Sequence, residues 1–178
     1  SLRAAVQEAN ARPGADTIVL PAGTYTFTRA GQNEENSLTG DLDVNDGLTI
    51  LGAGTRTTII DCNMLDRAFH IREPNTGAIT IQDLTIRNGI ENQHGGGIQH
   101  QRTTVTLTLL RVAIENCTAM EDGGGIACAP AITCGPSLVM RECTISGCTA
   151  MNGRGGALNH RINTGVASTL LIESCTFS

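Results

Sequence analysis

The residues that could do chemistry are concentrated near position 45, where oxygen-bearing side chains alternate along the chain. The run consists of four such residues and a glycine: Asp41, Asp43, Asn45, Asp46 and Gly47. Carboxylate and amide oxygens at alternating positions are ligands that a hard cation such as calcium prefers. An EF-hand would need its glycine one place earlier and a glutamate where Gly52 stands. The run therefore predicts either a calcium site or a turn whose carboxylates accept hydrogen bonds from nearby backbone N–H groups.

Histidine and cysteine recur at one position of a repeated pattern in the second half of the chain. His100, Cys128 and His160 each lie two residues after the Ile or Leu that follows a glycine turn. If the repeats stack, these three side chains form a column on successive coils. Imidazole and thiolate groups within reach of one another can bind zinc or copper. A ladder of hydrogen bonds is the alternative prediction for the same column.

Seven cysteines without a C-x-x-C pair favour an oxidising, extracellular compartment over a zinc site. Cys128 and Cys134 bracket a short insertion, and a disulfide between them would close that loop. Cys117 and Cys148 occupy equivalent corners of neighbouring repeats and could also pair. The other three are expected to be unpaired, two of them as small buried hydrophobes: Cys62, Cys143 and Cys175.

An internal repeat positions these residues. The same alternation of apolar side chains begins four times, about 30 residues apart, at Ile79, Leu107, Leu138 and Leu170. Apolar residues at alternate positions indicate short strands with one buried face. Glycine clusters between the copies indicate tight turns with a left-handed backbone. Their members are Gly95, Gly96, Gly97, Gly123, Gly124, Gly125, Gly155 and Gly156.

Each copy is predicted to be one coil of three short strands, and stacked coils bury a common core. The predicted fold class is an all-β, right-handed parallel β-helix of about five or six coils with a short N-terminal capping helix. One domain is expected over 1–178, with the helix at 1–13, irregular coils at 14–76 that include a protruding loop at 29–41, and regular repeats at 77–178. The chain stops within a repeat, which predicts a fragment of a longer protein.

Composition agrees with a thin β core and argues against two classes of function. Aromatic residues make up 2% of the chain, whereas an ordinary globular core usually contains more rings. The net charge is −5 and the basic residues are scattered, so nucleic-acid binding is not expected. No apolar run reaches the roughly 18 residues of a transmembrane helix, so no membrane-spanning segment is expected.

Short motifs near the N-terminus match a known family. They are SLRAAV at 1–6, ANA at 9–11, PGADTI at 13–18, LPAGTY at 20–25, GDLDV at 40–44 and LTILGAG at 48–54. These motifs resemble the N-terminal segment of the CSLREA-type bacterial surface proteins, which are β-helical members of the pectin-lyase-like superfamily. The later glycine clusters are similar to those of polymorphic outer-membrane proteins and autotransporter-like passengers. The resemblance implies a β-helix and a surface or secreted location, without implying a reaction.

The same superfamily includes polysaccharide lyases and hydrolases, which raises an enzymatic alternative. A lyase of this kind would need clustered carboxylates that hold calcium and an exposed arginine or lysine base. The candidates are Asp41, Asp43 and Asp46 for the carboxylates and Arg67, Arg87 and Arg111 for the base. The sequence fixes no arginine beside the carboxylates and offers no obvious aromatic platform for sugar rings. No catalytic residue is therefore predicted.

The predicted function is structural or adhesive. We expect a rod or filament subunit, extracellular or at a bacterial cell surface, whose copies associate through the ends of the β-helix. An open end exposes both apolar core and unpaired strand, which favours such association. A surface glycan or host ligand is the other expected partner, and calcium the one cofactor considered. The alternative is a carbohydrate-binding or polysaccharide-cleaving module.

Overall fold

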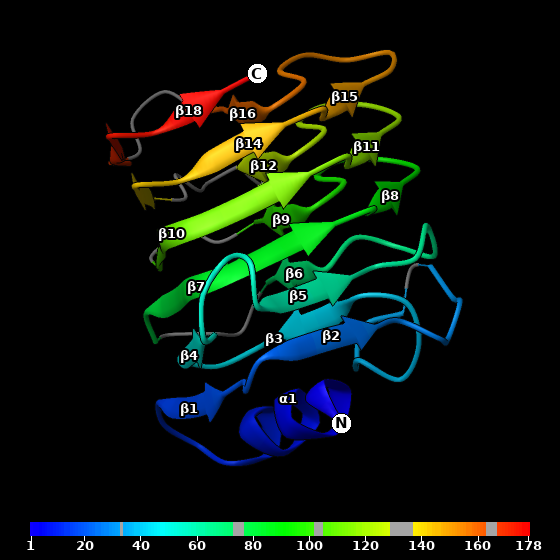
Figure 1. Ribbon diagram of the computed structural model, residues 1–178, viewed down its shortest axis with the longest axis vertical. Helices are drawn as coiled ribbons and strands as arrows, with labels where there is room; N and C mark the ends of the chain where they lie inside the picture. Colours follow the sequence, from blue (N-terminus) through cyan, green and yellow to red (C-terminus); the bar gives the residue numbers. More distant parts are fainter. Residues whose placement is uncertain (33, 73–76, 102–104, 129–136, 163–166) are drawn as a thin grey trace.

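The computed structural model describes residues 1–32, 34–72, 77–101, 105–128, 137–162 and 167–178. Over these residues the chain is an all-β parallel solenoid of about five coils with one short helix (Figure 1). The predicted β-solenoid with an N-terminal helix is thus confirmed. Strands of successive coils lie side by side along the rod, and the two ends of the chain lie at its opposite ends (Figure 1).

The described strands form three parallel sheets along the rod. The first contains β1 (Asp16–Val19), β2 (Gly23–Thr26), β4 (Leu48–Leu51), β5 (Thr58–Asp61), β7 (Ile79–Arg87), β10 (Thr106–Glu115), β13 (Ser137–Arg141), β14 (Thr144–Ser146), β17 (Leu170–Glu173) and β18 (Thr176–Phe177). The second contains β3 (Leu42–Val44), β6 (Phe69–Ile71), β9 (Ile98–His100), β12 (Ile126–Cys128) and β16 (Leu158–His160). The third contains β8 (Ile90–Glu91), β11 (Thr118–Ala119) and β15 (Thr149–Ala150).

The register of strand pairing aligns the predicted repeats residue by residue. Ile79 pairs with Leu107, Leu107 with Leu138, and Leu138 with Leu170. Ile79, Leu107 and Leu138 are fully buried, so this position forms one internal apolar column. Because the register is the same from coil to coil, side chains at equivalent positions stack about 4.8 Å apart.

The regular coils turn at three corners, and each corner uses a left-handed backbone. The φ values at these positions lie between 50° and 72°. The first corner is formed by Asp83, Arg111, Glu142 and Ser174, the second by Asn88, Asn116 and Gly147, and the third by Gly95, Gly123 and Gly155. Left-handed backbone is unfavourable for most residues and is tolerated best by glycine and asparagine. The second and third corners therefore follow local preference, whereas the first depends on the surrounding contacts.

The middle glycine of each cluster is needed because two coils approach closely. Gly124 does not have a left-handed backbone. A Cβ atom added to it would lie 2.4 Å from the backbone carbonyl of Thr149 and 2.5 Å from the carbonyl oxygen of Gly156. Gly96 has the same relation to the next coil, with the Thr118 carbonyl oxygen at 2.4 Å. The clusters thus combine a left-handed turn with direct backbone contact between coils.

The helix α1 (Leu2–Ala11) covers the N-terminal end of the core. Ser1 caps the helix, and its buried face consists of Leu2, Val6 and Ala9. The side chain of Asn10 forms the hydrogen bonds that a neighbouring strand would otherwise form with β3 and the residue after it. It donates to the Asp43 carbonyl oxygen at 2.8 Å and accepts from the Asn45 N–H at 3.0 Å. The helix therefore covers apolar core and also satisfies part of a strand edge.

The sequence predicted that the loop at 29–41 protrudes from the rod. In the structure, part of this loop packs against the rod. Ser37 is fully buried and exchanges hydrogen bonds with Asp43. Its N–H donates to Asp43 Oδ2 at 2.9 Å, and its Oγ accepts from the Asp43 N–H at 2.7 Å. Arg3 of α1 donates to the backbone carbonyls of Ser37, Thr39 and Asp41 at 2.9 to 3.2 Å, and also to that of Gly40. These contacts fold the end of the loop against β3.

Replacing Gly124 by alanine should destabilise the solenoid strongly. The new methyl group would overlap the backbone of the next coil, which cannot move aside as a flexible side chain can. Overpacking typically costs 1–3 kcal/mol, so we expect Gly124→Ala to lower the free energy of unfolding by about 3 kcal/mol. Chemical denaturation followed by circular dichroism measures this value. Ala157→Gly is the matched control and should cost about 1 kcal/mol or less; equal losses would contradict the steric explanation.

Candidate functional site

A buried arginine lies at the centre of the most polar region inside the fold. Arg67 lies two residues before β6, and 7% of its side chain is exposed. Its Nε donates to Asp41 Oδ2 at 2.7 Å, and its Nη2 lies 3.1 Å from Glu91 Oε2. Its Nη1 donates to the carbonyl oxygen of His94 at 3.0 Å and to Gln99 Oε1. One guanidinium thereby joins segments that come from three successive coils.

A second carboxyl group beside Arg67 retains its proton. The Asp66 side chain is 1% exposed and accepts hydrogen bonds from the backbone N–H of Arg67 at 2.8 Å and of Asp41 at 3.1 Å. Burial, the charge of Asp41 and a hydrogen bond with Glu91 raise the pKa of Asp66 to about 8. Burial also raises the pKa of Asp41 to about 6, although the Arg67 charge acts in the opposite direction. The raised pKa favours the protonated form of Asp66 at neutral pH.

The cluster around Arg67 has the groups of an acid–base centre but little access to solvent. A carboxyl that keeps its proton near neutral pH could act as a general acid if it reached a substrate. The side chains of Arg67, Asp41, Asp66 and Glu91 are each at most 7% exposed. Each of them also contacts another member of the cluster. The arrangement is therefore suited to fixing loop and strands relative to one another.

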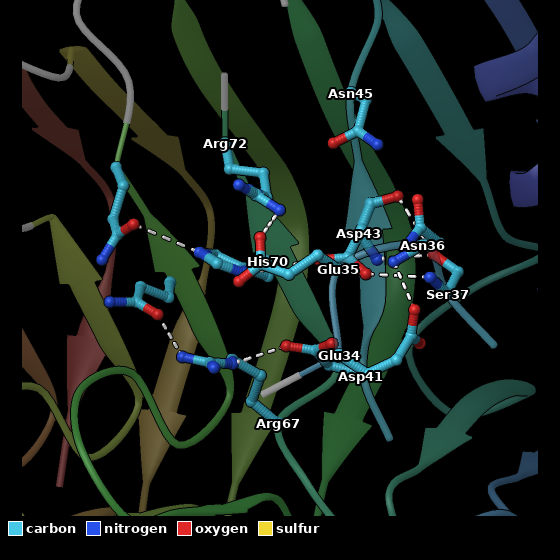
Figure 2. Close-up of polar contacts among 12 residues, drawn as sticks. Glu34, Glu35, Asn36, Ser37, Asp41, Asp43, Asn45, Arg67, His70 and Arg72 are labelled. Atoms are coloured by element: carbon cyan, nitrogen blue, oxygen red, sulfur yellow. Dashed lines mark hydrogen bonds and ion pairs between the residues drawn. The ribbon is translucent and has the colours of Figure 1, made fainter. Parts of the chain in front are cut away.

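Glu35, Asp43 and His70 form a second cluster beside the first (Figure 2). One potential ligand atom of each residue lies within 4.8 Å of those of the other two. Asp43 and His70 occupy paired positions of β3 and β6, so the strand register places them together. Glu35 comes from the loop at 29–41 and forms an ion pair with Arg72. Two carboxylates and an imidazole are a donor set that can hold a metal ion.

Two of the four predicted calcium ligands, Asp41 and Asp46, make other contacts. Asp41 contacts Arg67, as described above. Asp46 accepts hydrogen bonds from the Gly47 N–H at 2.7 Å and the Gly14 N–H at 2.9 Å, which is the role expected of a turn residue. The convergent ligand group found among the described residues includes neither Asp41 nor Asp46. Calcium binding by the predicted set stays a prediction.

The other two candidate lyase bases link neighbouring coils. Arg87 Nη2 lies 2.8 Å from Asp61 Oδ2. Arg111 binds both carboxylate oxygens of Asp83, at 2.6 Å and 2.8 Å. The hydrogen bonds from Arg111 hold the pKa of Asp83 below its usual range. Of the three candidate bases, Arg67 is the one that contacts the acidic run, at Asp41, and the sequence did not specify this pairing.

The register places His100, Cys128 and His160 in one column, as predicted. His100 Nε2 lies 3.1 Å from the Val105 carbonyl oxygen, and His160 Nε2 lies 3.4 Å from Ser168 Oγ. Each imidazole thus contacts the chain that follows its own strand. Burial raises the pKa of the Cys128 thiol to about 12, which disfavours the thiolate that a metal requires. Hydrogen bonding explains this column better than metal binding.

The described cysteines are free thiols: Cys62, Cys117, Cys128, Cys143, Cys148 and Cys175. The predicted disulfide between Cys117 and Cys148 is not formed. Their thiols lie on adjacent coils, and the hydrogen bond with Cys148, together with burial, raises the pKa of Cys117. A protonated thiol of this kind reacts slowly in disulfide exchange. Cys134, the predicted partner of Cys128, lies outside the described residues.

Glu35, His70 and Glu91 were not among the sequence candidates. A signal for His70 was present, because Leu42-Asp43-Val44 and Phe69-His70-Ile71 share an apolar–polar–apolar pattern. These segments pair residue for residue in the structure. The first coils lack the regular spacing of the later repeats, so the pattern alone does not align them.

Comparison with known proteins finds no relative for this parallel β-solenoid. No family model matches the chain, and neither a curated protein nor a solved structure matches it. Among the described residues, no helix has the length and apolar character needed to cross a membrane. The fold assignment therefore rests on the structure, and the family resemblance rests on sequence motifs.

The stability of the fold should decrease as the pH rises from about 4 to about 8. Asp66 and Asp41 have pKa values of about 8 and about 6 in the folded chain, above the ordinary value of 3.8. The folded state therefore binds more protons than the unfolded state across this range, and it loses this advantage as the pH rises. Urea denaturation at several pH values measures the slope, which Asp66→Asn should reduce.

Asp83→Asn is the matched control for that measurement. Arg111 lowers the pKa of Asp83, so this carboxylate contributes stability above its unfolded pKa and loses it on acidification. The variant should be less stable at neutral pH, and its slope between about pH 5 and pH 8 should equal that of the unmodified chain. An unchanged slope in Asp66→Asn would show that Asp66 does not retain its proton.

Proposed function

We propose that this chain is a structural segment, a rigid β-solenoid rod, that acts at the cell surface or outside the cell. The observation that carries the proposal is the use of charged side chains as links between coils. Arg87 binds Asp61, Arg111 binds Asp83, and Arg141 Nε lies 2.9 Å from Glu173 Oε2. Each pair bridges neighbouring coils at or beside the strands of the first sheet.

Charges of opposite sign follow one another along the axis of the rod. The register aligns Asp61 with Arg87 and Arg87 with Glu115. Opposite charges on adjacent strands attract and like charges repel, so this order favours stacking in one register. Arginines that could have served as catalytic bases thus act to join coils. This use supports a structural role over the enzymatic alternative.

An extracellular location and an adhesive role form the second part of the proposal. Their support is the resemblance of the segments at 1–6 and 20–25 to bacterial surface proteins. A rod of stacked coils holds its outer corners at fixed spacing, which suits repeated contact with a host ligand or surface glycan.

Glycan binding is a second candidate because one pocket combines aromatic and basic side chains. The pocket has a volume of about 400 Å³ and is lined by residues of α1 and of the segment at 25–29. Tyr25 and Phe27 line it, with the Arg3 guanidinium 5.3 Å above the Phe27 ring. Aromatic rings beside arginines could hold an acidic sugar. A glycan array that compares the unmodified chain with Tyr25→Ala tests this role. Binding that the substitution weakens would support glycan recognition, and no binding by either chain would support a purely structural role.

Removing the Arg67 side chain should destabilise the rod far more than removing that of Arg111. Arg67→Met leaves Asp41 and Glu91 buried without their cation, which typically costs about 3–5 kcal/mol. Arg111 is 43% exposed, and exposed ion pairs contribute little, so Arg111→Met should have a small effect. Chemical denaturation measures both values. Comparable losses would argue against a structural centre at Arg67.

The enzymatic alternative requires a separate assay of the unmodified chain. Incubation with acidic polysaccharides and calcium should produce no unsaturated sugar ends, which are detected by their ultraviolet absorbance. The structural proposal fails if such products form and if Arg87→Gln or Arg111→Gln abolishes them without changing the melting temperature.

The coil formed by β17 and β18 carries the proposed self-association. Leu170, Ile172 and Phe177 are 45%, 40% and 43% exposed. These three exposed apolar side chains are the surface that we propose a second copy of this chain covers. Two copies that meet through the same face form a closed two-fold dimer. We propose this dimer as the associated form of the 178-residue chain.

Ile172→Lys should convert the associated chain into a monomer. A lysine at this position places a charge in the apolar contact, and burying an unpaired charge is unfavourable. Sedimentation velocity over a range of concentrations measures the change. Leu38→Lys serves as the control, because Leu38 is 54% exposed but lies in the loop at 29–41. A monomeric unmodified chain at high concentration would contradict the proposed dimer, and filaments would indicate a different contact.

A further inference from the structure

Asp43 presents a buried carboxylate oxygen that no hydrogen bond satisfies. The residue is fully buried, and its Oδ2 accepts from the Ser37 N–H at 2.9 Å. Among the described residues Oδ1 has no hydrogen-bond partner, and the nearest cationic candidate is His70 Nδ1 at 3.4 Å. A charge-assisted N–H···O bond normally spans about 2.7–2.9 Å. A buried carboxylate in this state needs a closer positive charge.

The orientation of His70 favours a metal ion as that charge. Its Nε2 lies 3.3 Å from Gln101 Oε1. An amide oxygen accepts hydrogen bonds, so Nε2 is the ring nitrogen that donates to Gln101, and Nδ1 is the ring nitrogen that faces Asp43 and is available to a metal ion. A metal ion between Nδ1 and Asp43 Oδ1 would bind both atoms. Histidine ligands in metal sites commonly donate their second ring N–H to an oxygen in this way.

The distances fit a tetrahedral ion. Two ligand atoms at about 2.0–2.1 Å from a zinc-like ion are about 3.3–3.4 Å apart at a tetrahedral angle. His70 Nδ1 and Asp43 Oδ1 are separated by 3.4 Å. A carboxylate oxygen of Glu35 lies within 4.8 Å of both ligand positions, on a side chain that is 45% exposed and able to approach further (Figure 2). We propose that Glu35, Asp43 and His70 bind a divalent transition-metal ion of the zinc type, with water as the fourth ligand.

Arg72 is compatible with this site because Glu35 has two carboxylate oxygens. One oxygen can keep the ion pair with Arg72 while the other binds the metal. A divalent ion neutralises the charges of Asp43 and Glu35, which reduces the cost of burying Asp43. The imidazole donor also sets this site apart from the predicted calcium set, because calcium takes oxygen ligands.

A metal ion at this position would fasten the loop at 29–41 to the second sheet. Asp43 belongs to β3 and His70 to β6, whereas Glu35 lies on the loop itself. The ion would therefore connect two coils and the segment that covers them. This role is independent of whether the rod associates or binds glycans.

Titration of the 178-residue chain with Co²⁺ tests the site directly, because the visible absorption of Co²⁺ reports its ligands. We expect one ion per chain and no charge-transfer band from thiolate. Asp43→Asn, His70→Gln and Glu35→Gln should each weaken binding about tenfold or more. Arg72→Gln should bind at least as tightly, because a nearby positive charge is removed. His94→Gln is the matched control and should bind normally, since His94 also lies between two carboxylates, Glu121 and Asp122.

Several results would overturn the assignment. They are the absence of Co²⁺ binding, undiminished binding in Asp43→Asn, a thiolate band, or tighter binding of Ca²⁺ than of Co²⁺. Because Asp43 is buried, circular dichroism first establishes that its variant folds. If the Asp43→Asn variant does not fold, Co²⁺ binding by Glu35→Gln tests the proposal instead, because Glu35 is on the exposed part of a loop. Undiminished binding by Glu35→Gln would also overturn the proposal.

Discussion

In-register parallel stacking is the constraint on which every other feature of this structure depends. Each coil repeats the positions of the coil below, so any side chain meets its equivalent about 4.8 Å away. An apolar residue becomes part of a continuous core, as Ile79, Leu107 and Leu138 do. A charged residue would meet a like charge unless the sign alternates, as it does from Asp61 to Arg87 to Glu115. Stacking thus selects the residue type at each position of the repeat.

The same constraint explains why the regular repeats could be predicted from the sequence and their columns located. Apolar spacing aligned Leu107 with Leu138, and the glycine clusters aligned His100 with Cys128. The position of a residue within the repeat was enough to predict its neighbours, because each of these contacts joins equivalent residues of adjacent coils. The disulfide prediction for Cys117 and Cys148 placed the two residues correctly on adjacent coils, but this proximity alone did not form the bond.

The polar clusters could not be predicted in this way because their members are not equivalent residues of a repeat. Arg67 reaches Asp41 and Glu91, which lie before β3 and in β8, and no common spacing relates the three positions. Glu35 joins Asp43 and His70 only because the loop at 29–41 folds back onto β3. That folding depends on the contacts of Arg3 and Ser37, which are decided by tertiary structure.

The two buried clusters share one structural role, which is to hold a polar loop on a sheet that is buried on both faces. All three residues of β3 are buried, so bulk solvent does not solvate the Asp43 carboxylate. Apolar residues in its place would often be equally or more stabilising than a buried ion pair. Apolar contacts, however, would accept several positions of the loop, whereas the directed hydrogen bonds of Arg67 and Asp43 accept one. We interpret the buried charges as a means of fixing loop position, at a cost in stability that the apolar columns of the core offset.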